Sequence, residues 1–215
     1  LVDLVFWETF PEQVIDYEND LEVLSARRWA TELTPSQFER VTKLDTYPDY
    51  LQKDVKDSVL HVYSNGEINF TVNGVHAKVS VIWNYEAPEG AKDTHYSILR
   101  GTKANLVIRQ GAEQNYLTTL YVEPTEGVDM AAAENALEAA LADLSEEYPG
   151  LAMEKSENGW MVNIPDKYKV GHEAHFAQVT ERYLQYLKDG KLPDWEIPNM
   201  LAKYYVTTKG YELSR

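Results

Sequence analysis

Two Asn-Gly pairs that lie eight residues apart constrain the fold of this chain more than any other feature. Asn65-Gly66 and Asn73-Gly74 stand between runs rich in Val, Ile, Phe, Tyr and Thr. Because Asn and Gly tolerate positive φ at both central positions of a tight turn, this dipeptide is the strongest short signal for a β-hairpin. The spacing predicts two hairpin turns in succession.

The residues between and after these pairs alternate as strand residues do. Ile68, Phe70 and Val72 alternate with Glu67, Asn69 and Thr71, and the same period of two continues from Val75 to Trp83. Side chains of a strand point alternately to its two faces, so this pattern gives one apolar face and one wet face.

A connection that contains Pro and Gly, residues 87–94, leads from this hairpin into two further strand-like runs, residues 95–101 and 105–110. We expect four to five strands of one antiparallel meander over residues 57–110, in the form of an open sheet.

Helices are expected on both sides of this meander. Thr34 as N-cap, Pro35 at the first helical position and Gln37 three residues after the cap are typical of a capping box. We expect helices at residues 1–8, 34–44, 129–148, 171–189 and 198–213, further strands at 20–30 and 119–122, and a third hairpin around Asn158-Gly159.

Apolar side chains recur at helical spacing in the last two predicted helices. The helix of residues 171–189 carries one stripe, and we expect the stripe of the last helix to face inward. The stripes consist of Phe176, Val179, Tyr183 and Leu187, and of Leu201, Tyr204, Tyr205, Thr208 and Tyr211.

Strands and helices are segregated along the chain, which indicates the α+β class: an open antiparallel sheet with flanking helices. The length of 215 residues fits a single domain over residues 1–215. Residues 129–165, a helix followed by a hairpin, are expected to form an insertion in that domain.

Composition excludes several function classes. The 35 acidic and 20 basic residues give a formal net charge of −15, so the surface repels phosphate backbones and argues against a nucleic-acid partner. No apolar run approaches about 18 residues, so no membrane span is expected. The absence of cysteine excludes disulfides and thiolate catalysis.

Motifs for metal or nucleotide binding are absent from these residues. His172 and His175 are three apart at a predicted helix start, where a zinc protease helix needs histidines four apart, so a capping role is favoured and no metal site is expected. The chain has no Gly-rich strand-to-helix turn, so we expect it to bind no dinucleotide cofactor itself.

The polar face of the predicted meander has two interpretations. It can be an ordinary solvated face, or a ligand wall on which aromatic side chains stack on a sugar ring while His, Lys and Arg bond the sugar hydroxyls. The residues concerned are His61, His76, Lys78, His95, Tyr96, Arg100 and Arg109, beside Trp83 and Tyr85.

Several segments resemble a known family. Leu1–Trp7 resembles the end of the His-x-x-Asp-Leu-x-x-Trp helix of Gfo/Idh/MocA-type oxidoreductases, and Gly101–Leu106 resembles their Gly-Thr-x-Gly-x-Leu turn, with Ala104 in place of the second Gly. The chain is still more similar to the C-terminal domain of a group of bacterial oxidoreductases common in Bacteroidetes. That likeness covers nearly the whole chain, notably His76–Asn84 and Asp93–Leu106.

The resemblance implies that these residues are the second domain of an NAD(P)-dependent enzyme that acts on sugars, inositols or related polyols. Family members begin with a Rossmann domain that carries the Gly-rich loop and a catalytic Lys, and their catalytic His would immediately precede Leu1. We therefore expect no catalytic residue in this chain, which would be inactive alone, and NAD or NADP bound elsewhere in the parent protein.

The partners that the resemblance implies are the protein's own N-terminal Rossmann domain, a small sugar-like substrate and another copy of the chain. The candidate substrate-binding residues are Asp3, Lys78, Trp83, His95, Tyr96 and Arg100. Two alternatives stay open: a carbohydrate-binding module without catalysis, and a dimerisation domain whose enzyme has lost its function. The bacterial cytoplasm and the periplasm are both compatible with the sequence.

Overall fold

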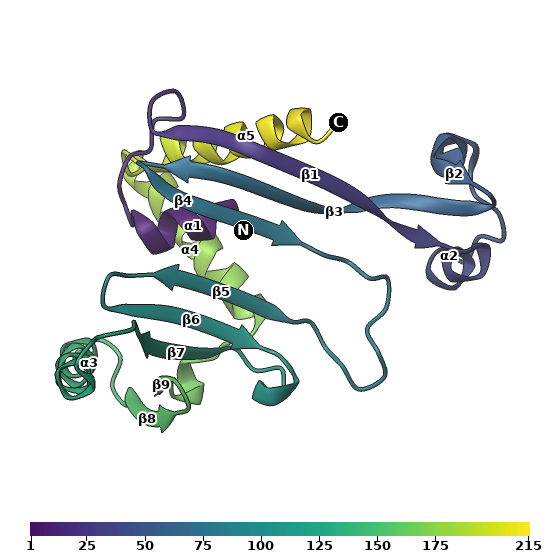
Figure 1. Ribbon diagram of the computed structural model, residues 1–215. Helices are drawn as coiled ribbons and strands as arrows, with labels where there is room; N and C mark the ends of the chain where they lie inside the picture. Colours follow the sequence, from purple (N-terminus) through teal and green to yellow (C-terminus); the bar gives the residue numbers. More distant parts are fainter. The chain divides into compact units, whose positions relative to one another are not determined.

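A computed structural model describes residues 1–215, which divide into two units, each built on its own open antiparallel sheet (Figure 1). Unit 1 consists of Leu1–Glu86 and Lys191–Arg215, and unit 2 of Ala87–Gly190. Each unit combines sheet and helices, so the predicted α+β class is confirmed. No helix is both long and apolar enough to cross a membrane.

The sheet of unit 1 is organised around its longest strand, β3. This strand pairs antiparallel with β1 on one side and with β4 on the other, and its first residues also pair with the short β2. The strands are β1 (Leu21–Leu33), β2 (Val55–Lys56), β3 (Val59–Val72) and β4 (Val75–Val81).

Helices α1 and α5 cover one face of this sheet (Figure 1). Phe6 of α1 meets Phe70 of β3 edge to face, with ring centres 6.5 Å apart, and Val72 and Val206 are fully buried beside them. The alternation predicted for β3 therefore holds, since its apolar residues form the core under the helices. The helices of unit 1 are α1 (Val2–Thr9), α2 (Pro35–Thr42), the 3-10 helix η1 (Asp49–Asp54) and α5 (Glu196–Leu213).

The prediction of the inward face of α5 is wrong by one position. Ala202, Val206 and Gly210 face the sheet, whereas Leu201, Tyr204, Thr208 and Tyr211 are exposed and only Tyr205 of the expected stripe packs against the core. The reason is close approach, because a Cβ on Gly210 would lie 2.6 Å from Cδ1 of Ile68. Small residues let the helix backbone lie near the sheet, and the bulky residues point away.

Asn73-Gly74 forms the predicted turn between β3 and β4, with φ of 47° and 78°. The turn predicted at Asn65-Gly66 is wrong, because β3 continues straight through it. Asn65 pairs with Trp29 and Gly66 with Arg28. Asn65 is 4% exposed, and its amide is used for buried hydrogen bonds instead of a turn.

A second small core lies under α2 and η1. Leu33, Phe38 and Leu60 are buried there, and the rings of Phe38 and Tyr47 meet edge to face. The capping box predicted at the start of α2 is present: the Gln37 amide donates to Thr34 Oγ1, and the Gln37 side chain accepts from the Thr34 amide.

Unit 2 has a five-stranded sheet in the order β5-β6-β7-β9-β8. The prediction that these strands continue one meander with β3 and β4 is therefore wrong. Alternation identifies a strand but not its partner, and residues 82–94 form a connection far longer than a hairpin loop. The strands are β5 (His95–Arg100), β6 (Ala104–Gln110), β7 (Thr119–Pro124), β8 (Ala152–Ser156) and β9 (Gly159–Asn163).

The helix and hairpin predicted at residues 129–165 are present, and β9 pairs with β7, so this hairpin extends the sheet of unit 2. The helix α3 (Met130–Leu144) lies within the predicted range 129–148, and Asp129 at its start accepts hydrogen bonds from two backbone amides. Leu141, Trp160 and Val162 are buried. The short 3-10 helices η2 (Ala112–Gln114) and η3 (Asp166–Tyr168) complete the connections.

Helix α4 (His172–Asp189) carries the predicted apolar stripe, but none of its residues is buried. Phe176 is 68% exposed, and Val179, Tyr183 and Leu187 are exposed as well. Gly190 follows the predicted last residue of the helix and ends it in the left-handed conformation.

Candidate functional site

The six candidate residues do not share one sheet. Asp3, Lys78 and Trp83 belong to unit 1, whereas His95, Tyr96 and Arg100 lie on β5 of unit 2. The prediction of a single polar face for all the charged and aromatic residues of the meander is therefore wrong, and each group is described within its own unit.

Lys78 belongs to a three-strand charge cluster on the polar face of unit 1. Oε2 of Glu67 on β3 lies 2.8 Å from Nζ of Lys78 on β4 and 3.2 Å from Nη2 of Arg27 on β1. Hydrogen bonds from Lys78, and next from Arg27, lower the pKa of Glu67 from 4.5 to about 2. The Glu67 carboxylate is thus held ionised between two cations.

The same face continues with polar and aromatic side chains. The guanidinium of Arg27 lies 4.9 Å from the ring centre of Trp29 on the same strand, and Nδ2 of Asn69 donates to Oγ of Ser25 at 3.1 Å. The sequence did not single out Arg27, Trp29 and Glu67, because only the register of β1 against β3 brings them together. The arrangement offers a polar ligand both hydrogen-bonding groups and an aromatic ring.

Trp83 lies in a segment that is fixed at one end of unit 1. Its amide donates to Oδ1 of Asn65 at 2.6 Å, its carbonyl accepts from the hydroxyl of Thr31, and its indole ring lies 6.2 Å from the ring of Tyr85. Nδ2 of Asn65 donates to Oγ1 of Thr31 at 2.9 Å and to the carbonyl of Trp29 at 3.2 Å. Buried Asn65 therefore fixes the position of Trp83.

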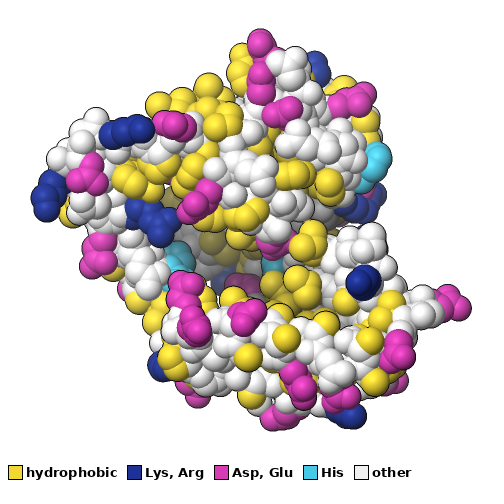
Figure 2. Space-filling view, turned by 90° about the vertical axis from the view of Figure 1, so that its left-hand side faces the viewer, with side chains coloured by type: hydrophobic (Ala, Val, Ile, Leu, Met, Phe, Trp, Pro, Cys, Tyr) yellow, Lys and Arg dark blue, Asp and Glu magenta, His cyan; other side chains and the backbone are white.

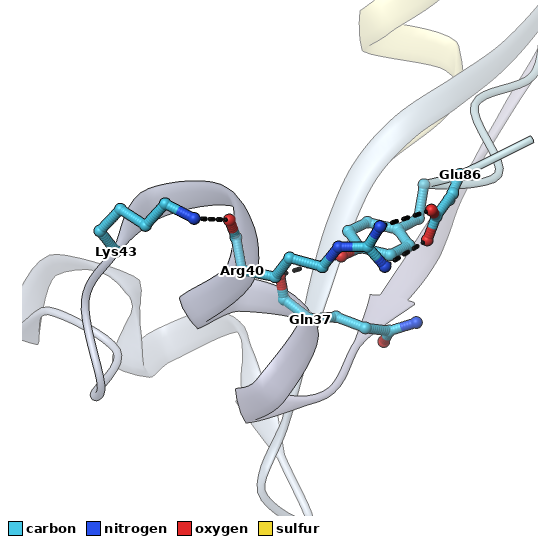
Figure 3. Close-up of polar contacts among 5 residues, drawn as sticks. Gln37, Arg40, Lys43 and Glu86 are labelled. Atoms are coloured by element: carbon cyan, nitrogen blue, oxygen red, sulfur yellow. Dashed lines mark hydrogen bonds and ion pairs between the residues drawn. The ribbon is translucent and has the colours of Figure 1, made fainter.

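Two further contacts hold this segment to α2 (Figure 3). Arg40 makes a two-pronged ion pair with Glu86, with bonds of 2.8 and 2.9 Å, and the hydroxyl of Tyr85 donates to the carbonyl of Gln37 at 3.2 Å. Tyr85 has a φ of 68°, which a non-glycine residue seldom adopts, so these contacts keep the backbone in a sparsely populated conformation.

A shallow polar hollow of about 320 Å³ runs along α2, lined by Ser36, Glu39, Arg40 and Lys43. Of its two cations, Arg40 is paired with Glu86, and Lys43 donates to the Arg40 carbonyl at 2.9 Å (Figure 3). None of the six candidate residues lines this hollow.

Asp3 joins two helices. Its Oδ2 lies 3.2 Å from Nζ of Lys203 on α5. This contact ties α1 to α5 beside the main core of unit 1.

The three candidates on β5 lie on both faces of that strand. His95 is its first residue, as predicted, and lies opposite Gln110. Tyr96 and Arg100 point to the other face, where Tyr96 is 63% exposed. Arg100 lies opposite Asn105 and has no carboxylate partner.

Arg109, the cross-strand neighbour of Tyr96, is engaged with its own unit. Its Nη2 lies 2.8 Å from Oε1 of Glu123, and its guanidinium lies 4.9 Å from the ring centre of Tyr121. Tyr96 and Arg100 are therefore the freer polar groups on this face.

The segment Gly101–Leu106 contains the turn between β5 and β6, residues 101–103, and the first residues of β6. The Gly101 amide donates to the carbonyl of Ala104 at 3.1 Å, and a Cβ on Gly101 would lie 2.6 Å from that same oxygen. Only glycine fits this close approach, which explains the first position of the motif noted in the sequence.

A family model described as "Putative oxidoreductase C terminal domain" matches residues 1–215. The chain belongs to this family. The crystal structure of a putative oxidoreductase from Parabacteroides merdae ATCC 43184 is similar to it, with a TM-score of 0.97 and 57% sequence identity. The match covers 99% of this chain and 49% of that one. A search of curated proteins found no match.

This oxidoreductase C-terminal domain thus spans about half the length of the Parabacteroides merdae protein. The predicted likeness to the C-terminal domain of bacterial oxidoreductases is confirmed, and the wider Gfo/Idh/MocA resemblance stays a prediction.

The strand arrangement differs from that of a Rossmann fold. Every strand pair is antiparallel, and no Gly-rich turn leads from a parallel strand into a helix, the arrangement that holds a pyrophosphate. No group of three or more His, Asp or Glu side chains is arranged to hold a metal ion.

Proposed function

We propose that this oxidoreductase C-terminal domain is the substrate-binding and assembly part of an NAD(P)-dependent enzyme of the Gfo/Idh/MocA type, inactive by itself, that acts on a sugar or polyol. The observation that carries the proposal is the family match over all 215 residues, together with a relative whose chain is about twice as long. The cofactor and the catalytic base belong, in this proposal, to a Rossmann domain in the same polypeptide.

The proposed substrate contacts come from two groups of residues. Tyr96 presents an exposed ring on which a sugar can stack, and Arg100 on the same face has no carboxylate partner. In unit 2, His95 at the start of β5 can bond a hydroxyl group. In unit 1, Lys78 and Trp83 are separate candidates for such a contact. Asp3 would act only through α1, because Lys203 occupies its carboxylate.

The proposal requires that the chain alone bind no nicotinamide dinucleotide. We expect titration of residues 1–215 with NADH, followed by fluorescence or calorimetry, to give no saturable signal. Binding of NADH at micromolar concentration would contradict the proposal that the cofactor binds to the Rossmann domain.

The substrate part is tested in a polypeptide that carries both halves, with sugars and polyols assayed for reduction of NAD or NADP. His95→Ala should lower kcat/KM by the loss of one polar contact, about 1–3 kcal/mol, or roughly 5- to 150-fold. His172→Ala, an exposed first-turn change in α4, is the matched control and should leave kcat/KM unchanged. Equal effects of both variants on kcat/KM would show that His95 does not contact the substrate.

The alternative of a carbohydrate-binding domain without catalysis is favoured by one observation, the exposed ring of Tyr96. Sugar binding by residues 1–215, weakened by Tyr96→Ala and unaccompanied by turnover in the longer polypeptide, would support that alternative over the enzyme.

Assembly is tested by light scattering on the purified chain. Exposed apolar side chains, among them Phe176 and Val179 of α4, favour association, and Figure 2 shows hydrophobic side chains gathered on the surface among scattered Asp and Glu. Because the chain carries a net charge of −15, we expect a dimer or larger species that is favoured by salt. A monomer at high concentration and high salt would contradict it.

A further inference from the structure

Arg28 of β1 and Arg215 after α5 are two cations of unit 1 without a carboxylate partner. Neither belongs to any of the ion pairs of the structure. In a chain with 35 acidic and 20 basic residues, carboxylates are plentiful. What distinguishes Arg28 and Arg215 from the other cations without a carboxylate partner is that both lie against Tyr211.

Both guanidinium groups converge on one phenol. Arg28 lies 4.9 Å from the ring centre of Tyr63 and 5.1 Å from that of Tyr211. Arg215 lies 4.5 Å from the ring centre of Tyr211, and its Nη2 donates to the Tyr211 hydroxyl at 3.0 Å. Hydrogen bonding from Arg215, and next from Arg28, lowers the pKa of Tyr211 from its usual value.

Arg28 lies on the face of β1 opposite to the one on which its neighbour Arg27 binds Glu67. Arg27 and Arg28 are consecutive strand residues and point to opposite faces, so Glu67 neutralises Arg27 only. The residue paired with Arg28 is Gly66, which has no side chain. A Cβ on Gly66 would meet only the Arg27 carbonyl, at 3.8 Å, so the space beside Arg28 is open.

The end of α5 does not supply enough negative charge to balance the two arginines. The carbonyl end of a helix is equivalent to about half an elementary charge, and the nearby carboxylate of Glu212 already lies 3.1 Å from Nζ of Lys209. Stacking on Tyr63 and Tyr211 stabilises the cations without neutralising them.

We propose that Arg28, Tyr63, Tyr211 and Arg215 form a binding site for a small oxyanion, either a carboxylate or a phosphate group. Each guanidinium presents a planar fork of N–H donors that matches such a group. The hydroxyl of Tyr211 accepts from Arg215 and keeps its own proton to donate to the anion. The site lies wholly in unit 1 and does not rest on the proposed enzymatic function.

The test titrates residues 1–215 with inorganic phosphate and, separately, with acetate, each at constant ionic strength set by sodium chloride, and follows amide chemical shifts by NMR. We expect saturable shifts near Arg28 and Tyr211 with at least one of the two anions, at about millimolar concentration. Which anion saturates at lower concentration distinguishes a phosphate site from a carboxylate site.

Matched variants decide whether the arginines carry the binding. Arg28→Gln and Arg215→Gln should each weaken it about tenfold, whereas Arg27→Gln, whose cation Glu67 already neutralises, should leave it unchanged. Arg215 follows the last helix, so its variant reports on binding even if Arg28→Gln alters the sheet. No saturation by either anion up to about 50 mM, or equal loss in Arg27→Gln, would overturn the proposal.

Discussion

Replacing Asn65 with alanine should destabilise unit 1 by about 2–4 kcal/mol. Its side chain makes three hydrogen bonds, to Trp29, Thr31 and Trp83, and it is 4% exposed. Each bond contributes about 1 kcal/mol net, and truncation leaves the Trp83 amide without its acceptor, which costs about 1–3 kcal/mol. Water that enters the space left by the side chain can bond some of the freed polar groups, so the expected loss stays within about 2–4 kcal/mol.

Asn69 provides the matched control for this change. It lies four residues further along the same strand, but its side chain makes one hydrogen bond, to the hydroxyl of Ser25 at an exposed position. Asn69→Ala should therefore change the free energy of unfolding by no more than about 0.5 kcal/mol.

Urea unfolding followed by tryptophan fluorescence measures both variants. Trp7, Trp29, Trp83 and Trp195, four of the five tryptophans, lie in unit 1, so the signal reports mainly on that unit. We expect a lower midpoint for Asn65→Ala with an unchanged slope m, which indicates a loss of stability without a change in the surface exposed. Equal midpoints for the two alanine variants would refute the argument that Asn65 anchors Trp83.

Three further predictions concern the packing, the charges and the helix caps of unit 1. Gly210→Ala should lower the free energy of unfolding by up to about 2 kcal/mol, because overpacking against Ile68 (about 1–3 kcal/mol) exceeds the gain in helix propensity (about 1 kcal/mol). In a double-mutant cycle, Ile68→Val should recover part of this loss, and simple additivity of the two changes would contradict the reasoning. The pKa of Glu67 is about 2 in the folded protein and 4.5 as its ordinary value, so its contribution to stability is full above pH 4.5 and is lost as the pH falls toward 2. The urea midpoint of the unchanged protein should therefore fall over this pH range more than that of Glu67→Gln, and an equal fall in both proteins would refute this. Thr34→Ala should lower the free energy of unfolding by about 1 kcal/mol, measured by thermal or urea unfolding, whereas Thr34→Ser should lower it little. Equal stabilities of the two variants would mean that the capping bond with Gln37 contributes nothing.

The two Asn-Gly pairs show how far the local sequence predicts this fold. Asn73-Gly74 forms the turn because both residues adopt positive φ and the flanking strands pair directly across it. The identical dipeptide at Asn65-Gly66 stays inside β3, because burial of the amide between Trp29 and Trp83 stabilises the extended strand. Local propensity is the same in both places, so only tertiary contacts decide between turn and strand.

Helix boundaries were predicted well, whereas the buried side of α5 was not. The caps at Thr34, Asp129 and Gly190 depend on local hydrogen bonds and backbone conformation, which sequence encodes directly. The face of α5 depends on how near the helix lies to the sheet. Apolar size favoured the stripe through Tyr204, but the adjacent stripe with Ala202 and Gly210 allows the closer approach.

The candidate site was harder to predict than the strands that carry it, because alternation gives the face of a residue but not its cross-strand partner. Arg27 and Arg28 illustrate the difference. They are identical in type and adjacent in sequence, yet Arg27 lies 3.2 Å from a carboxylate and Arg28 lies between two tyrosine rings without one. The net charge of the chain does not indicate which of the two arginines has a carboxylate neighbour. Which arginine remains available to bind an anion follows from the register of β1 against β3, since that register sets Glu67 opposite Arg27 and glycine opposite Arg28.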